Sequence, residues 1–312
     1  MECRLLGLLK KPSALRGRIG LSLGESQVAL ALVRREGGEA VLERCELMPL
    51  RPAEAVAGLL KDAALPRLPV SAVLAPTEYQ LILVEAPDVP PAELKAAMRW
   101  RLKDSIDFRI EDAVIDVFEI PEPIRRGQGR MMYAVATRRG VVERQAALIA
   151  GLAPLEVIDI PELCLRNLAA LVPAAASGVA LLHLSATSAA IVLTRGPTFY
   201  FARQMELRPG AGSGAPDAPD APDAAAIMLE LQRSLDYYER HFDQPPITRV
   251  VLAPADARSA ALAHELKSES GLEVELLDLN ERLRCREPLS PQLQSAALLA
   301  VGAALREEHR SL

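Results

Sequence analysis

Two short turns in this sequence have the form of a phosphate clamp, but the polar residues that would make the clamp are altered in both. Each turn lies between two apolar, β-rich segments, which cover 18–23 and 28–33 in the first unit and 179–184 and 189–193 in the second. The turn residues are Ser22, Gly24 and Glu25 in the first unit and Ser185, Ala186, Thr187 and Ser188 in the second. Backbone amides of such turns can hold an anion. Gly24 and residues 185–188 also suit tight hairpin turns, and we favour the hairpins.

Both units continue in the same way, which indicates an internal duplication. A glycine turn follows at 36–39 and again at 194–197, and a third short β-rich segment follows at 40–47 and at 198–202. Two matching three-strand meanders about half a chain apart predict an α/β protein with two lobes. The 312 residues of the chain suit two lobes of roughly 150 residues each.

The composition excludes several classes of protein. The net charge is −5, whereas a nucleic-acid-binding surface needs clustered lysine and arginine. The four cysteines lie far apart, which argues against a structural zinc site and suits a reducing cytoplasm. There is no run of about eighteen apolar residues that would span a membrane. We expect residues 1–17 to form an N-terminal extension whose Leu-rich start is a frayed end or a lid strand rather than a membrane-surface anchor.

The first lobe, expected over 18–178, contains a segment of different character at about 85–155. Before this segment the sequence predicts a helix at 51–64 and strands at 70–75 and 81–84. Within it the sequence predicts a helix at 92–106, strands at 113–120 and 131–137, a helix at 139–152 and a strand at 155–158. This order indicates a small α+β subdomain inserted into the first lobe.

The inserted helix carries the candidate surface for a protein partner. Leu94, Met98, Leu102 and Ile106 recur every fourth residue and predict its buried stripe. That stripe leaves five neighbouring side chains for a partner, namely Arg99, Trp100, Arg101, Lys103 and Asp104. Trp and Arg are common at the energetic centres of protein interfaces. Two alternatives stay open: Trp100 packs against the subdomain's own sheet, and the basic residues form an ordinary solvated face.

The second lobe, expected over 179–312, ends as the first would without its insertion. A loop rich in Gly, Ala, Pro and Asp covers 209–223, and this composition predicts flexible chain rather than core. After the loop the sequence predicts helices at 224–242, 257–270 and 291–308, and strands at 249–253 and 273–277.

Four stretches of the sequence are similar to those of a known family. They are Arg99–Asp104 with Ile106–Phe108, Asp112–Phe118, Leu231–Tyr238 and Ala303–Arg306. In these stretches, and over about 18–306 as a whole, the chain resembles the actin-like ATPase superfamily and, within it, the PilM proteins of type IV pilus assembly. It is most similar to their MshI branch from mannose-sensitive haemagglutinin (MSHA) pili. The resemblance implies an actin-like, duplicated ribonuclease-H-like α/β fold of two lobes, with an α+β subdomain inserted in the first.

The same resemblance implies a role and a partner. PilM-like proteins lie in the cytoplasm against the inner membrane and bind the cytoplasmic N-terminal tail of a single-pass PilN-like membrane protein. The tail occupies a groove where the inserted subdomain meets the first lobe. We therefore expect a non-enzymatic cytoplasmic adaptor of a type IV or MSHA pilus platform, held at the inner membrane by this partner and in contact with other pilus components.

The resemblance also bears on the two turns as a nucleotide site. Some PilM-like proteins hold ATP between the lobes, and actin-like ATPases place an Asp that organises Mg²⁺ where this chain has Ser22. Glu25 would put a negative charge where a phosphate would lie. In the second turn, His183-Leu184-Ser185 stands where the family has Asp-x-Gly. We expect His183 to be a packed, hydrogen-bonded histidine.

A third turn contacts the nucleotide in this superfamily, and it is also altered here. Pro254 and Ala255 stand where the family has a pair of glycines, and they remove an N–H donor and add a Cβ. We therefore expect no catalytic residue and no metal site. We expect no cofactor either, because ATP or Mg²⁺ binding should be weak or absent.

Two alternative functions come from the same superfamily. An actin-like ATP-binding protein, ATPase or sugar kinase needs one carboxylate for the metal and one for base catalysis, and the usual motif positions supply neither. The cytoplasmic part of a GspL-like type II secretion component normally continues into a transmembrane helix, which this sequence does not contain. The oligomeric state, including an actin-like filament, stays open.

Overall fold

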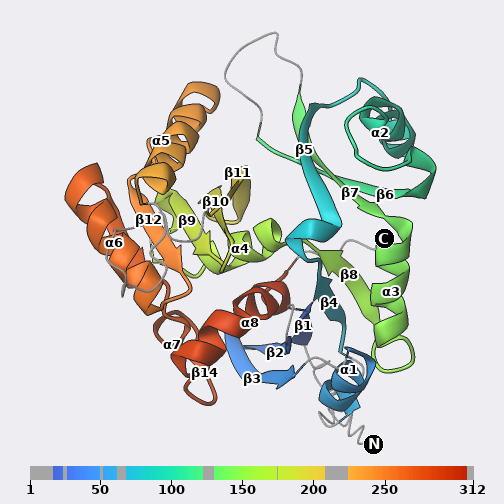
Figure 1. Ribbon diagram of the computed structural model, residues 1–312, viewed down its shortest axis with the longest axis horizontal. Helices are drawn as coiled ribbons and strands as arrows, with labels where there is room; N and C mark the ends of the chain where they lie inside the picture. The colour runs from blue at the N-terminus through green and yellow to red at the C-terminus, as the bar shows by residue number, and fades with distance from the viewer. Residues whose placement is uncertain are drawn as a thin grey trace, which may run out of the picture.

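The computed structural model describes residues 17–23, 27–49, 52–61, 68–121, 130–173, 175–207 and 224–307. Its strands form three sheets of six, five and three strands. Figure 1 shows the two larger sheets on either side of helices α4 (Pro161–Ala169) and α8 (Pro291–Ala304), with the smallest sheet at the upper right. None of the described helices is long and apolar enough to cross a membrane.

The six-stranded sheet has the order β14-β3-β2-β1-β4-β8. An antiparallel meander of β1 (Gly17–Leu23), β2 (Gln27–Glu36) and β3 (Glu39–Pro49) is followed by the parallel strands β4 (Val70–Val73) and β8 (Leu155–Asp159). Gly37 and Gly38 in the β2–β3 turn both have positive φ, which side chains other than glycine rarely tolerate. Helices α1 (Pro52–Lys61) and α3 (Arg139–Ile149) cover one face of the sheet, and α8 covers the other.

The five-stranded sheet has the order β11-β10-β9-β12-β13. Its meander consists of β9 (Val179–Leu184), β10 (Ser188–Arg195) and β11 (Thr198–Glu206), and its parallel strands are β12 (Arg249–Ala253) and β13 (Glu273–Leu276). Helices α5 (Ala224–His241) and α6 (Ala257–Ser270) pack on this sheet. Its strand order and directions repeat those of the first sheet, so the predicted duplication is confirmed.

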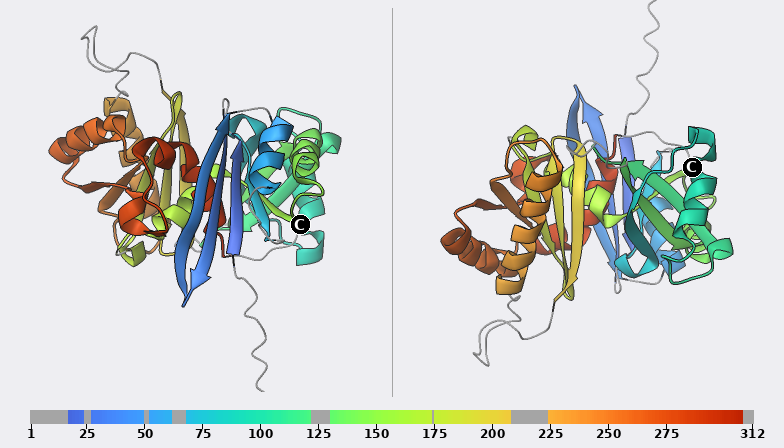
Figure 2. Two further views of the ribbon diagram at one scale, coloured as in Figure 1. Left: turned by 90° about the horizontal axis from the view of Figure 1, so that it is seen from below. Right: turned by 90° about the horizontal axis from the view of Figure 1, so that it is seen from above.

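Helices α4 and α8 cross between the two lobes. Helix α4 follows the first sheet but packs against β9, β10 and β11, whereas α8 follows the second sheet but packs against β1 to β4. Figure 2 shows α8, in red, against the blue strands of the first sheet. The sequence assigns α8 to the second lobe, and the structure instead places it on the first sheet, where the short strand β14 (Arg284–Cys285) also pairs with β3.

Two glycines make the packing of α8 unusually close. A Cβ on Gly20 of β1 would lie 1.8 Å from the carbonyl oxygen of Ala300, and a Cβ on Gly302 would lie 2.5 Å from the carbonyl oxygen of Cys164 in α4. No real Cβ lies so near a backbone atom. The close packing of α8 between the sheet and α4 therefore requires glycine at both positions.

The inserted subdomain is an antiparallel sheet of order β5-β7-β6 with helix α2 (Leu94–Leu102) on one face. Its strands are β5 (Tyr79–Glu85), β6 (Ala113–Glu119) and β7 (Met131–Arg138). The sequence places the β5 segment in the first lobe and the β8 segment in the subdomain, and both assignments are wrong, because β5 pairs with β7 and β8 pairs with β4. A short apolar strand does not encode its own pairing partner, which depends on tertiary packing.

Short helices complete the described structure, namely 3₁₀ turns at Pro76–Glu78, Pro91–Glu93, Ile110–Asp112 and Ala175–Ser177, and helix α7 (Leu279–Arg282). Residues 1–16, Gly24, Glu25 and the predicted loop at 209–223 lie outside the described residues.

Candidate functional site

A groove of about 540 Å³ lies where the inserted subdomain meets both lobes. Strands β6 and β7, helices α3 and α4, the end of β8 and the start of β11 all contribute to it. Most lining side chains are apolar: Leu74, Val114, Val117, Phe118, Val135, Val142, Val157, Ile158, Ile160, Leu163, Pro197 and Phe199. The polar ones are Asp116, Glu119, Thr137, Asp159, Arg166, Thr198 and Arg306. The groove therefore suits an apolar ligand that carries a few polar groups.

Strand β6 turns one set of side chains toward the groove and the other toward α2. Val114, Asp116 and Phe118 line the groove, whereas Ala113 and Ile115 pack with the buried face of α2, as the alternation of a strand favours. Val117 and Glu119, near the end of the strand, also border the groove. Strand β6 is also the last strand of its sheet, and among the described residues it pairs with β7 alone. Such an edge offers unpaired N–H and C=O groups to an extended peptide.

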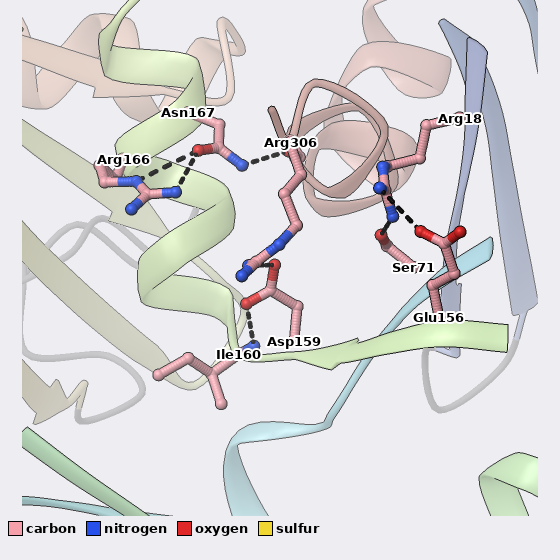
Figure 3. A network of polar contacts seen from close by, with 9 residues as sticks. Arg18, Ser71, Glu156, Asp159, Ile160, Arg166, Asn167 and Arg306 are labelled. Carbon is pink, nitrogen blue, oxygen red and sulfur yellow. Dashed lines mark hydrogen bonds and ion pairs between the residues drawn. The ribbon is translucent and has the colours of Figure 1, made fainter. Parts of the chain in front are cut away.

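A buried ion pair lines the groove (Figure 3). Arg306, which follows α8, donates a 2.7 Å hydrogen bond to Asp159 at the end of β8, and the two side chains are only 8% and 1% exposed. The other carboxylate oxygen of Asp159 accepts a 3.0 Å hydrogen bond from the backbone of Ile160. Beside them, Asn167 of α4 donates to the carbonyl oxygen of Gly302 in α8 at 2.9 Å. These contacts tie β8, α4 and α8 together next to the groove.

A second polar cluster, buried at Tyr79 and Glu162 and exposed at Gln204, joins the subdomain to both lobes. Glu162, in the first turn of α4, is fully buried and accepts a 2.7 Å hydrogen bond from Tyr79 of β5. Gln204 of β11 donates to Glu162 and, at 3.0 Å, to Tyr79. Burial raises the pKa of the Glu162 carboxyl above its ordinary value, although the two donors oppose this shift. Burial also raises the pKa of the Tyr79 hydroxyl well above its usual value, and the charge of Glu162 adds to that effect.

Three aromatic rings connect the subdomain to the second lobe. Phe118 of β6, Tyr133 of β7 and Phe199 of β11 lie with their ring centroids 5.4 Å apart in each pair. The hydroxyl of Tyr133 accepts a 3.3 Å hydrogen bond from the backbone of Ala202. Phe118 and Phe199 also line the groove, so a ligand there would touch the contact between the subdomain and the second lobe.

The first of the two polar turns is only partly described. Ser22 lies on β1, hydrogen-bonded between strands β2 and β4, and its side chain is partly buried. Gly24 and Glu25 lie outside the described residues.

The second turn is closed by its own contacts. The backbone N–H of Ser185 donates to the carbonyl oxygen of Ser188 at 2.9 Å, and the Ser185 hydroxyl accepts from the backbone of Ser188 at 3.0 Å. Thr187 is exposed, and its carbonyl oxygen accepts from Leu207 at the end of β11. The guanidinium of Arg258 donates to the carbonyl oxygen of Ser185. The four residues 185–188 thus form the tight hairpin turn that the sequence favours.

His183 and the third turn are packed into the second lobe. Burial lowers the pKa of His183 to about 4, although the negative charge of Asp256 opposes the shift. The ring of His183 makes no hydrogen bond with any described residue, and the hydrogen-bonded part of that prediction stays a prediction. Pro254 is buried, and Asp256 caps α6 by accepting a 2.8 Å hydrogen bond from Ser259. In the described part of the chain, no group of three or more His, Cys, Asp or Glu side chains is placed to hold a metal ion.

The partner residues predicted on α2 lie on the far side of the subdomain sheet from the groove. Arg99 donates to the carbonyl oxygens of Ile110 and Ala113, and Arg101 donates to that of Glu85, so both serve the subdomain itself. Trp100 is 78% exposed, which rules out its packing against the sheet.

The remaining two residues of this predicted set are exposed. Lys103 extends over the Trp100 ring, with its Nζ 5.6 Å from the ring centroid, and Asp104 is exposed beside it. None of the five predicted residues lines the groove.

The groove residues were missed because they come from distant segments. Val114, Leu163 and Phe199 lie on three elements that belong to the subdomain, to α4 and to the second lobe. The alternation of Val114, Asp116 and Phe118 was a usable signal for a two-faced strand. Only the tertiary fold shows that this strand is at an edge and faces α4.

Comparison with known proteins bears on the fold. No protein-family model matches the chain, and no curated protein matches it. Among solved structures, the PilM-PilN type IV pilus biogenesis complex matches with 23% identity over 94% of this chain and 98% of that chain, at a TM-score of 0.67.

Two other solved structures also match the chain. The cytoplasmic domain of EpsL, an inner membrane component of the type II secretion system of Vibrio cholerae, matches with 13% identity over 94% and 97% of the two chains, at a TM-score of 0.50. A Bacteroides thetaiotaomicron protein with an actin-like ATPase fold and unknown function matches with 8% identity over 89% and 96%, at 0.49. With its duplicated sheets and crossing helices, the chain therefore has the predicted actin-like fold and is similar in structure to a chain of the PilM-PilN complex.

Proposed function

We propose that this chain is a non-enzymatic adaptor of a type IV pilus platform, of the MSHA type, that binds the cytoplasmic tail of a PilN-like single-pass membrane protein. It would act at the cytoplasmic face of the inner membrane. The observation that carries this proposal is the apolar groove where the subdomain meets both lobes; it includes the boundary between subdomain and first lobe, where the resemblance to PilM-like proteins puts the tail. The structural similarity to the PilM-PilN complex supports it.

The groove also indicates how a tail would bind. An extended segment can pair its backbone with the free edge of β6 and direct alternate side chains into the groove. Val114, Phe118 and Leu163 would receive apolar side chains there. We therefore expect a tail with apolar residues at every second position rather than an amphipathic helix.

The described turns support an adaptor rather than an ATPase. Ser22 and Ser185 replace the carboxylate and glycine of the family pattern, and Arg258 contacts the second turn directly. A hydroxyl is a poor substitute for a carboxylate as a ligand of Mg²⁺. The similarity to the EpsL domain keeps a type II secretion component of the GspL kind as the second candidate, and the identity of the bound tail separates the two.

The test is calorimetric binding of a synthetic peptide that carries the cytoplasmic tail of a PilN-like protein encoded by a neighbouring gene. A Val114→Arg variant would place a charge in the partly exposed groove wall, and we expect it to weaken binding at least about tenfold, or about 1.4 kcal/mol. Trp100→Ala, on the opposite face of the subdomain, is the matched control and should bind as the wild type does.

Two results would contradict this assignment. If Trp100→Ala abolished binding and Val114→Arg did not, the tail would bind on α2. If the wild-type chain bound the PilN-like tail no better than a scrambled peptide but bound the tail of a GspL-associated secretion protein, the second candidate would replace the first.

A further inference from the structure

The outward face of α2 is an unusual surface for a protein of this composition. Trp100 is 78% exposed, and among the described residues only Leu229, at 49%, is a second large hydrophobic side chain so exposed. Figure 1 shows α2 at the outer rim of the subdomain, with its far side turned to solvent. Met98 and Leu102 are buried on the opposite side of the same helix. Exposure of the single Trp of the chain on such a rim points to a protein contact.

The residues around Trp100 form one straight stripe. Glu93, Ala96, Trp100 and Lys103 follow each other at spacings of three, four and three, and all four are exposed. This is the spacing at which one helix presents a seam to a second helix. Ala96 leaves room one turn away from the large Trp100 ring.

The charges of the stripe are self-complementary. Glu93 stands at the start of the helix and Lys103 at its end, and neither forms an ion pair with another described residue. The cations that flank the stripe form ion pairs within the subdomain: Lys95 pairs with Asp116, and Arg101 pairs with Glu85. The acid and the base of the stripe, neither of which forms an ion pair with a described residue, thus lie at opposite ends of one seam.

We propose that a second copy of this chain docks on α2 in an antiparallel, two-fold symmetric pair. In that arrangement Glu93 faces Lys103 of the second copy and Ala96 faces its Trp100, and symmetry makes each contact twice. A parallel pair would instead set Glu93 against Glu93, Lys103 against Lys103 and Trp100 against Trp100. The charge pattern therefore selects both the partner and its direction.

The size of α2 determines the strength of this contact. A helix of nine residues cannot bury the roughly 800 Å² per partner of a standard stable interface, so the pair should be weak and dependent on concentration. The α2 face lies on the opposite side of the subdomain sheet from the groove. Self-association and tail binding can therefore occur together, and either can fail without the other.

The test is sedimentation equilibrium of the full chain up to millimolar concentration, with charge-reversal variants. Glu93→Lys and Lys103→Glu should each weaken self-association roughly tenfold, because each replaces two attractive contacts by two repulsive ones. An equal mixture of the two variants should recover the association. In the mixed pair, the lysine introduced at position 93 faces the glutamate introduced at position 103, and the native Lys103 of the first variant faces the native Glu93 of the second. Lys95→Glu changes the net charge as Lys103→Glu does, but on the flank of the helix, and should leave association unchanged.

Trp100→Ala should abolish the association, and all these variants should keep the wild-type melting temperature because the altered side chains are exposed. A wild-type chain that sediments as a monomer throughout would overturn the proposal. So would a dimer that survives both charge reversals, or one that the mixture of variants does not restore.

Discussion

The hydroxyl of Tyr79 donates a 2.7 Å hydrogen bond to the buried carboxylate of Glu162, and this contact joins the inserted subdomain to helix α4. Gln204 of the second lobe donates to the same two groups. One buried carboxyl thus accepts hydrogen bonds from two parts of the molecule that are far apart in sequence. Because Tyr79 and Glu162 are both buried and so have little access to water, the contact between them favours a single arrangement of subdomain and lobes.

Tyr79→Phe should destabilise the protein by about 1–3 kcal/mol, because it leaves one oxygen of a buried carboxylate without its donor. The free energy of unfolding in urea measures this loss. Tyr237→Phe is the matched control, since the Tyr237 hydroxyl makes no hydrogen bond with any described residue, and it should stay within about 0.5 kcal/mol of the wild type. Equal effects of the two changes would mean that the Glu162 contact contributes nothing.

Glu162 should make stability depend on pH. Its folded-state pKa is raised by burial above the ordinary value of 4.5, so the folded protein holds this proton to higher pH than the unfolded chain does. The free energy of unfolding should therefore fall as pH rises from 4.5 through the folded-state pKa. In Glu162→Gln the free energy of unfolding should fall less steeply with rising pH than in the wild type. Urea unfolding at a series of pH values measures this difference. A variant with the wild-type pH slope would show that Glu162 titrates normally.

His183 should act in the opposite direction. Its folded-state pKa is lowered from 6.5 to about 4, so its contribution to stability is complete above pH 6.5 and is lost as pH falls toward 4. The loss should amount to at most about 3 kcal/mol. His183→Leu should remove this acid sensitivity when it is compared with the wild type in the same urea series. If the free energy of unfolding of the variant falls with acid as steeply as that of the wild type, the lowered pKa of His183 is contradicted.

Gly20→Ala should prevent the close packing of α8 on β1. The added Cβ would meet the backbone of Ala300 at 1.8 Å, and a collision with backbone in a packed core costs more than about 4 kcal/mol or abolishes folding. Gly140→Ala is the control: a Cβ there meets nothing within 4 Å, and in helix α3 it should raise stability by about 0.5–1 kcal/mol. Thermal unfolding followed by circular dichroism checks both, and a Gly20→Ala protein of normal stability would show that α8 does not pack as described.

Mg-ATP should not stabilise the folded protein. A ligand at about 100 times its dissociation constant adds about 2.7 kcal/mol to the free energy of unfolding, which a thermal melt detects easily. We expect no saturable rise in melting temperature up to millimolar Mg-ATP, with Mg²⁺ alone as the reference titration. A saturable rise would mean that the altered turns still hold nucleotide, and the ATPase hypothesis would return.

The local sequence determined the features that depend on neighbouring residues. The glycine turn at Gly37–Gly38 and the hairpin at Ser185–Ser188 follow from residues that lie in the turns themselves. The buried and exposed faces of α2 follow from a spacing of four, which is why Met98 is buried and Trp100 is not. The repeat of the meander in both halves then leads to the two-lobed fold.

The tertiary structure alone decided which distant segments meet. The pairing of β5 with β7, the seat of α8 on the first sheet and the contact of Tyr79 with Glu162 and Gln204 all join residues far apart in the chain. The groove has the same origin, because its walls come from the subdomain and both lobes. Local propensity acts over a few neighbouring residues, whereas these contacts are selected by the burial of whole faces against one another, and no short stretch of sequence records which faces will meet.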